Sequence, residues 1–141
     1  MIGKKAPGFT AVSIDNTFVS LDDFSGRPVV INFWAIRCPY CVDEMSYIQQ
    51  AYDEYADRGL VILGINNGET SGSVKPFIEN NGYTYTILLD TDTSIAGKYG
   101  VYYLPTTYFI DDRGIIQDIV IAPFQSKGDF ENYLDKIMVL N

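Results

Sequence analysis

The only two cysteines of the chain stand two residues apart, in Cys38-Pro39-Tyr40-Cys41. They follow a β-rich apolar run over residues 29–34, and a helical pattern follows them. The sequence therefore predicts that Cys38 lies at the N-terminus of a helix, where unpaired N–H groups and the helix dipole stabilise a thiolate. Cys41 falls on the same face of the first turn, within reach of a disulfide. This spacing predicts a redox pair in which Cys38 is the exposed nucleophile and Cys41 resolves the mixed disulfide.

A structural disulfide and half of a metal site are the alternative interpretations of this pair. In the chain-entropy model, so short a loop restrains the unfolded chain by only about 2 kcal/mol, against roughly 3 kcal/mol for a loop of 15 residues. A zinc site needs a second pair of ligands, and the chain has no histidine and no third cysteine. Redox chemistry is therefore favoured, and we expect no metal and no cofactor beyond the Cys38–Cys41 disulfide.

Length and composition suit one domain that spans residues 1–141, since 47% of the residues are hydrophobic. The net charge of −8 disfavours binding to nucleic acids and to anionic membrane surfaces, because both are negatively charged. No apolar run approaches the roughly 20 residues of a membrane span, and no signal-peptide pattern follows Met1. A signal or anchor that precedes residue 1 is compatible with these observations, so composition leaves the compartment open.

Strands and helices alternate along the sequence. The predicted elements are, in chain order, a strand pair at 9–20, a helical turn at 21–24, a strand at 28–34, a helix at 39–57, a strand at 60–65, a helix at 73–80 capped by Ser73, a strand at 85–89, a short helix at 94–99, a hairpin of strands at 107–110 and 115–121, and a helix at 127–138. This order predicts an α/β fold: a central mixed β-sheet flanked by helices on both faces, with an N-terminal β-hairpin.

Several short motifs, in a specific order, resemble the thioredoxin-like thiol-disulfide oxidoreductases, and within them the ResA/TlpA-like branch of the redoxins. These motifs are Ala6-Pro7-Gly8-Phe9, Leu21-Asp22-Asp23-Phe24-Ser25-Gly26, Val30-Ile31-Asn32-Phe33-Trp34-Ala35, Gly64-Ile65-Asn66, Leu89-Asp90-Thr91-Asp92 and Leu104-Pro105-Thr106-Thr107. The resemblance covers nearly the whole chain. It implies a thioredoxin fold and an enzyme that reduces disulfides in protein substrates, with cytochrome c maturation as one setting.

The same resemblance implies protein thiols and disulfides as substrates, an upstream thiol reductant, and a monomer. It also implies an extracytoplasmic location in a bacterium, with the cytoplasm as the alternative. Two departures bear on partner choice: Arg37 stands where the family usually has a bulky neutral residue, and the glutaredoxin-like dipeptide Pro39-Tyr40 occurs without a second glycine-rich glutathione-recognition stretch after Pro105. Partner specificity is therefore open.

Glu44 lies three residues after Cys41, on the cysteine face of the predicted helix. From the residues alone, a glutamate that offsets the helix dipole is the favoured interpretation. The ResA-like branch has a functional glutamate at this position, so the resemblance implies that Glu44 exchanges a proton with a thiol. Most thioredoxins instead carry a buried aspartate in the preceding strand, where this chain has Asn32.

Pro105 resembles the cis-proline that faces the cysteines throughout the thioredoxin fold, although an X-Pro bond without such context is usually trans. The resemblance implies that Thr106 and the Leu104 backbone form a ledge on which an extended substrate segment pairs like an added strand.

Aromatic residues near the cysteines have two interpretations each. Trp34 either shields the sulfurs or is simple core. The resemblance places Pro39 and Tyr40 in the substrate-binding surface together with Trp34. For the tyrosines at 99–103, amphipathic packing is favoured over a binding rim.

Two rival functions fit less well. A peroxiredoxin-type peroxidase has a threonine three residues before the attacking cysteine, and here that residue is Ala35. A Cu(I) delivery protein would bind the ion between two thiolates, but no histidine or methionine cluster accompanies this pair.

Overall fold

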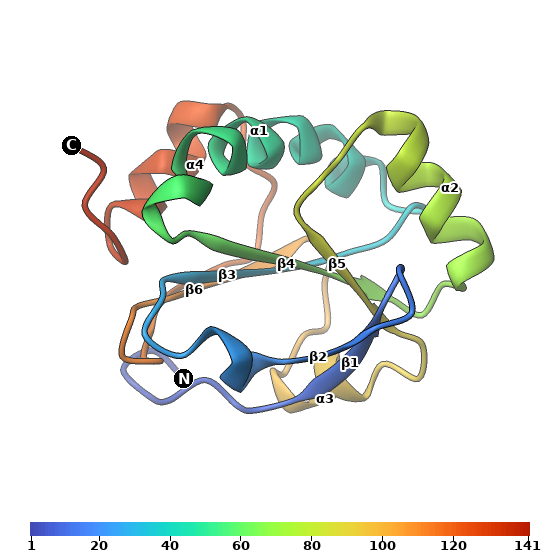
Figure 1. The fold of residues 1–141 in the computed structure, drawn as a ribbon, viewed down its shortest axis with the longest axis horizontal. Helices are drawn as coiled ribbons and strands as arrows, with labels where there is room; N and C mark the ends of the chain where they lie inside the picture. The colour runs from blue at the N-terminus through green and yellow to red at the C-terminus, as the bar shows by residue number, and fades with distance from the viewer.

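The computed structural model describes residues 1–141 and contains one seven-stranded mixed sheet in the order β2-β1-β5-β4-β3-β6-β7 (Figure 1). The strands are β1 (Thr10–Ser13), β2 (Phe18–Ser20), β3 (Val29–Trp34), β4 (Val61–Asn67), β5 (Thr86–Asp90), β6 (Thr106–Ile110) and β7 (Ile116–Val120). The helices are η1 (Leu21–Phe24), α1 (Pro39–Tyr55), η2 (Ala56–Arg58), α2 (Ser71–Asn81), α3 (Ser94–Lys98) and α4 (Lys127–Leu134).

Strand β3 lies near the centre of the sheet, and every one of its residues is buried. It pairs in parallel with β4, from Val29 opposite Val61 to Trp34 opposite Asn66, and antiparallel with β6. An uninterrupted apolar run is what a strand covered on both faces requires. The end of this rigid strand leads directly to Cys38, so the centre of the sheet fixes the position of the redox motif.

Helices cover both faces of the sheet, as the sequence predicted. Figure 1 shows α1, α2 and α4 on one face and α3 on the other. Met45 and Ile48 of α1 pack with Phe130 and Leu134 of α4 in one core cluster, and a second cluster on the opposite face includes Ile95 of α3. The N-terminal hairpin is also confirmed, and it joins the sheet because β1 pairs antiparallel with both β2 and β5.

Two predicted helix boundaries were wrong. Helix α2 begins at Ser71, with Thr70 rather than Ser73 at the N-cap. Its first turn contains two serines and a glycine, which give no apolar periodicity to signal a helix. Helix α4 ends at Leu134, four residues before the predicted end, because the chain continues in tighter turns in which Ile137 N–H bonds to the Leu134 carbonyl. Ile137 is still buried, which explains the longer apolar pattern.

None of the helices combines the length and the apolar character that crossing a lipid bilayer demands.

Candidate active site

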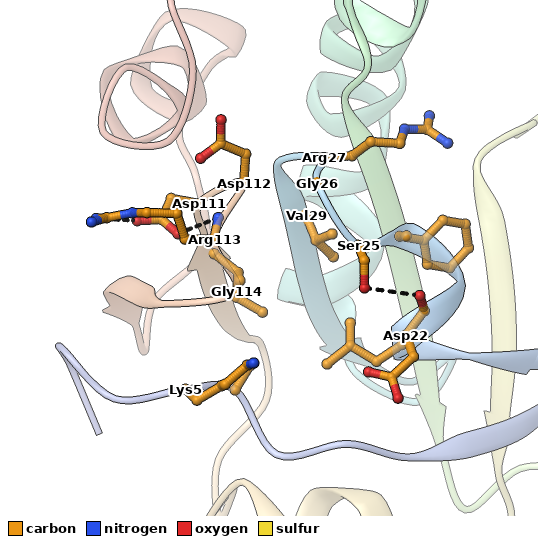
Figure 2. Close-up of a pocket in the computed structure, with 14 residues that line it drawn as sticks. Lys5, Asp22, Ser25, Gly26, Arg27, Val29, Asp111, Asp112, Arg113 and Gly114 are labelled. Atoms are coloured by element: carbon orange, nitrogen blue, oxygen red, sulfur yellow. Dashed lines mark hydrogen bonds and ion pairs between the residues drawn. The ribbon is translucent and has the colours of Figure 1, made fainter.

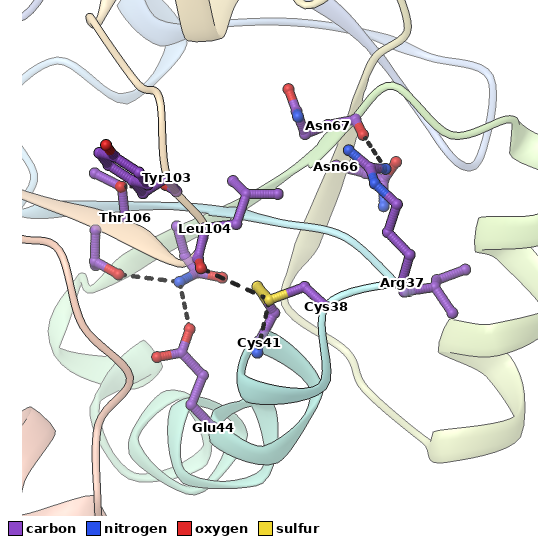
Figure 3. The surroundings of a disulfide bond; sticks show 12 residues. Arg37, Cys38, Cys41, Glu44, Asn66, Asn67, Tyr103, Leu104 and Thr106 are labelled. Atoms are coloured by element: carbon purple, nitrogen blue, oxygen red, sulfur yellow. Dashed lines mark hydrogen bonds between the residues drawn. A yellow bond between two sulfur atoms is a disulfide. The ribbon is translucent and has the colours of Figure 1, made fainter.

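The two cysteines form a disulfide at the start of α1, with their Cα atoms 5.3 Å apart (Figure 3). Cys38 is the N-cap residue, and its Sγ accepts the Cys41 N–H at 3.3 Å. Pro39 occupies the first helical position, where a missing N–H costs nothing. Cys38 is partly exposed, whereas Cys41 is completely buried. The two sulfurs therefore differ in access, as the sequence predicted.

The segment before β6 lies directly opposite the disulfide. The Leu104–Pro105 peptide bond is cis, as the resemblance implied. The Leu104 carbonyl oxygen lies 3.8 Å from Cys38 Sγ, and Figure 3 shows this carbonyl directed at the sulfurs. Thr106 is buried, and its hydroxyl donates to the Tyr103 carbonyl at 2.6 Å. The Thr106 side chain thus stabilises the turn that presents Leu104 to the disulfide.

Glu44 is completely buried, one helical turn after Cys41. Its Oε2 accepts the Asn32 side-chain amide at 2.9 Å, and its Oε1 accepts the Phe124 backbone N–H at 3.2 Å. Asn32 also donates to Thr107 Oγ1 at 3.0 Å, so β3 and β6 both hold the amide in place. The carboxyl group therefore sits in a fixed position on the cysteine face of α1.

Burial raises the pKa of Glu44 to about 7, against the lowering effect of the hydrogen bonds from Asn32 and Phe124. Removal of a carboxylate from water disfavours its charged form more than these two donors favour it. A pKa near neutrality allows the group both to take up and to release a proton under ordinary conditions. Without histidine in the chain, no imidazole competes for this task.

Exposed aromatic side chains flank the disulfide. Tyr40 is 66% exposed, and Tyr102 and Tyr103, just before Leu104, are 89% and 72% exposed. By contrast, Tyr99 is buried in the core, so the tyrosines at 99–103 divide between packing and surface. A hollow of about 380 Å³ continues from Tyr40 along α1 and is also lined by Asp43, Tyr47, Pro123, Phe124 and Gln125.

Trp34 is fully buried in the same core cluster as Cys41, and its ring packs 5.8 Å from that of Phe77. Its indole belongs to the core behind the redox pair and does not reach the surface. Of the two interpretations, the core assignment describes its position.

Reasoning from the sequence missed Glu69, which lies between β4 and α2. Its carboxylate accepts the backbone N–H groups of Ile36 and Arg37, the residues that lead into Cys38. A signal for this contact exists: parallel strands β3 and β4 end at the same edge of the sheet, so the loops that follow them meet there. The burial of Glu44 also had a signal, because Cys41, Glu44 and Ile48 share one helical face.

A separate cavity of about 260 Å³ lies at the other end of the sheet, where β3 begins at Val29 (Figure 2). Charged residues line it, including Lys5, Arg27 and Asp111. The Asp111 carboxylate already accepts bonds from Arg113, Ile115 and Gln117. No group of three or more potential metal ligands occurs in the structure. The redox pair follows the opposite end of β3 and lies outside this cavity.

Comparison with known proteins adds independent findings. The model of the AhpC/TSA family matches residues 2–119. Thiol-disulfide oxidoreductase ResA from Bacillus thuringiensis is 35% identical over 136 residues, which are 96% of this chain and 78% of that protein. ResA from Geobacillus kaustophilus has the same identity over 136 residues, with the same coverage of 96% and 78%.

Solved structures agree in fold. A thiol:disulfide interchange protein of the thioredoxin family from Chlorobium tepidum matches with a TM-score of 0.85 at 27% identity, over 96% of both chains. StoA from Bacillus subtilis matches with a TM-score of 0.77 at 22% identity, over 91% of this chain and 96% of StoA, which supports the fold alone.

The thioredoxin fold predicted from the sequence is therefore confirmed, and so is the resemblance to the ResA-like branch. The chain is a thiol-disulfide oxidoreductase, since near-complete coverage by relatives of that activity coincides with a disulfide between its only two cysteines. It belongs to the AhpC/TSA family, and within that family to the ResA-like thiol-disulfide oxidoreductases.

Proposed function

We propose that the protein acts as a reductase of disulfides in protein substrates, with Cys38 as the nucleophile. The observation that carries this proposal is the unequal access to the two sulfurs: Cys38 is partly exposed at the helix N-terminus, and Cys41 is completely buried. Only Cys38 can meet a substrate sulfur without rearrangement of α1. The helix N-terminus also stabilises its thiolate, as the Cys41 N–H directed at Cys38 Sγ illustrates.

The reaction balances as two successive exchanges. The Cys38 thiolate attacks one sulfur of the substrate disulfide, and the second substrate sulfur leaves as a thiolate that takes up a proton. Cys41 then loses its proton and attacks Cys38 Sγ, which forms the Cys38–Cys41 disulfide and releases the first substrate sulfur. Two electrons pass to the substrate. An upstream dithiol protein is needed to return two electrons and two protons to the cysteine pair.

Glu44 is the group that we assign to accept the proton of Cys41. It lies on the same helical face one turn away, and its pKa of about 7 suits proton exchange near neutrality. Burial keeps bulk water away from the carboxyl group, and the Asn32 amide fixes its orientation. A negatively charged Glu44 also destabilises a thiolate on the nearby cysteines. This favours the disulfide form of the pair, so the reduced protein is a stronger reductant.

We infer that the substrate segment lies along Leu104 and across the exposed residues between the cysteines. The Leu104 carbonyl faces the disulfide, so an extended polypeptide can pair with this backbone like an added strand. Pro39 and Tyr40 are exposed and can contact the substrate directly. Trp34 and Thr106 are buried, so we assign them a supporting role beneath that surface. Pro105, which follows Leu104 through the cis peptide bond, holds the turn that leads into β6.

A trapping experiment tests the assignment of the two sulfurs. The Cys41→Ser variant is expected to attack a protein disulfide such as that of insulin and to accumulate as a mixed disulfide through Cys38, because no resolving thiol remains. Cys38→Ser is the matched control and is expected to form no such adduct. Non-reducing electrophoresis with mass spectrometry of the linked peptides identifies the sulfur. Adducts through Cys41 in the Cys38→Ser variant, formed equally fast, would refute the assignment.

The resemblance to the ResA-like branch further supports a role in cytochrome c maturation, in which the substrate is a polypeptide with a Cys-x-x-Cys-His disulfide. We propose this substrate, an extracytoplasmic location and action as a monomer. The test is competition between an oxidised Cys-x-x-Cys-His peptide and insulin for the reduced protein. Faster reduction of the peptide is expected. Equal or slower reduction would contradict this substrate and indicate a general disulfide reductase.

Fractionation of the host cell tests the extracytoplasmic location, and sedimentation tests whether the protein is a monomer.

A further inference from the structure

The Glu69 carboxylate binds the loop that leads from β3 to Cys38. The four residues 35–38 connect β3 to α1, and two of their backbone N–H groups bond to the Glu69 carboxylate. Ile36 N–H donates to Oε1 at 2.7 Å and Arg37 N–H donates to Oε2 at 3.3 Å. Hydrogen bonds to a charged acceptor are about twice as strong as neutral ones, so one side chain holds the entry to the redox motif.

Glu69 is itself held by a rigid part of the sheet. Asn66, a completely buried residue of β4 opposite Trp34, donates from its side-chain amide to Glu69 Oε1 at 2.8 Å. In return, Asn66 Oδ1 accepts the Glu69 backbone N–H at 3.1 Å. This reciprocal pair fixes the carboxylate relative to the central strands, and through it the loop before Cys38.

The same carboxylate also engages the charge next to the nucleophile. The Arg37 guanidinium lies 3.6 Å from Glu69 Oε2 and donates to the Asn67 carbonyl at 2.9 Å. Figure 3 shows the Arg37 side chain directed at Asn67 and away from the two sulfurs. A cation one residue from Cys38 would stabilise its thiolate, but this one is directed elsewhere.

We propose that Glu69 is a positioning residue of the redox pair. It holds Arg37 against β4, away from Cys38, and thereby keeps the reduction potential of the cysteine pair low. The physical reason is electrostatic. A free Arg37 cation near Cys38 would favour the thiolate and so the reduced form, which makes a dithiol pair more oxidising. This inference rests on the thiol-disulfide exchange proposed above.

The experiment is a double-mutant cycle read out by the reduction potential in glutathione buffer. In this equilibrium the protein disulfide and two glutathione thiols give the protein dithiol and glutathione disulfide, so atoms and electrons balance. Glu69→Gln is expected to shift the equilibrium constant about fivefold towards the reduced protein, which is about 20 mV for a two-electron couple. Arg37→Gln alone is expected to leave the constant nearly unchanged, because Glu69 already holds that cation away.

The double variant separates positioning from charge loss. If Glu69 acts through Arg37, adding Arg37→Gln to Glu69→Gln removes more than half of the shift. Glu79→Gln, the same charge change at an exposed site of α2, is the control and is expected to shift nothing. No shift in Glu69→Gln, or a shift that the double variant retains by half or more, would overturn the proposal.

Two further readings keep the test decisive. Arg37→Gln changes an exposed side chain, so it reports even if Glu69→Gln does not fold. Arg37→Gln could also lower the reduction potential by as much as Glu69→Gln is expected to raise it. That result would mean that Arg37 already acts on the Cys38 sulfur in the wild type, which would also overturn the proposal. Failure of the wild-type protein to equilibrate with glutathione would instead contradict the proposed function.

Discussion

Replacement of Glu44 by glutamine should change how stability depends on pH. The substitution is nearly isosteric and removes only the titration. In the native protein the pKa of this buried carboxyl group is raised from 4.5 to about 7. Between about pH 4.5 and 7, the unfolded chain releases a proton that the native state retains, so the free energy of unfolding falls as pH rises. The shift corresponds to about 3 kcal/mol at pH 8 relative to pH 4.

The Glu44→Gln variant does not lose stability in this way as pH rises, because its side chain does not titrate. A glutamine places an amide N–H₂ group towards one of the two donors, Asn32 or Phe124, and this adds a penalty that is the same at every pH. The stability difference between variant and wild type should therefore move by about 3 kcal/mol in favour of the variant from pH 4 to pH 8. If the free energies of unfolding of variant and wild type stay parallel from pH 4 to pH 8, Glu44 is not a buried carboxyl group with a raised pKa.

Urea unfolding of the oxidised proteins measures this difference. The disulfide removes both thiols from the titration, and the chain has no histidine. The other carboxyl groups are common to the variant and the wild type, so their contribution cancels in the difference between the two. Glu79→Gln on the exposed face of α2 is the matched control. Its curve should remain parallel to that of the wild type.

Two further predictions concern catalysis and packing. At pH 7.5 Glu44→Gln, with both cysteines present, should slow the attack of Cys41 on the mixed disulfide about tenfold and abolish the rise in this rate near pH 7. Stopped-flow fluorescence checks this, and an unchanged pH–rate profile would return Glu44 to a dipole-compensating role. Gly64→Ala should destabilise the protein by about 1–3 kcal/mol, because a Cβ there would lie 2.9 Å from Ile87 Cδ1 and 3.0 Å from Tyr85 Cε2. Gly128→Ala, where only ordinary contacts occur, is the control in urea unfolding, and equal stability of both variants would contradict this close approach.

The features that the sequence predicted correctly are those with local signals. The apolar run of β3 and the helical period after Cys38 are properties of consecutive residues, so the strand, the helix and the unequal exposure of the two sulfurs followed directly. The cis bond before Pro105 has no local signal. It was expected only because the surrounding motif resembles a family, and the structure places it opposite Cys38.

The features that the residues alone did not predict depend on contacts between distant segments. Glu44 looked like a residue that offsets the helix dipole, but its burial depends on the Phe124 segment, 80 residues away in sequence. Glu69 looked like an ordinary loop carboxylate, and its contact with Ile36 depends on how β3 and β4 align. In both cases the topology of the sheet supplies the partner that short-range patterns do not show.

The reduction potential of the Cys38–Cys41 pair decides between a reductase and an oxidase. Equilibration with a glutathione buffer, followed by alkylation and mass spectrometry, gives the value. Pro39 and Tyr40 bring no charge between the cysteines, Glu44 opposes a thiolate, and Arg37 is held away from the sulfurs. We therefore expect a reduction potential nearer to about −270 mV, as in thioredoxin, than to about −120 mV, as in DsbA. A value near the oxidising end, with a Cys38 thiolate that persists at about pH 4, would contradict the reductase in favour of an oxidase.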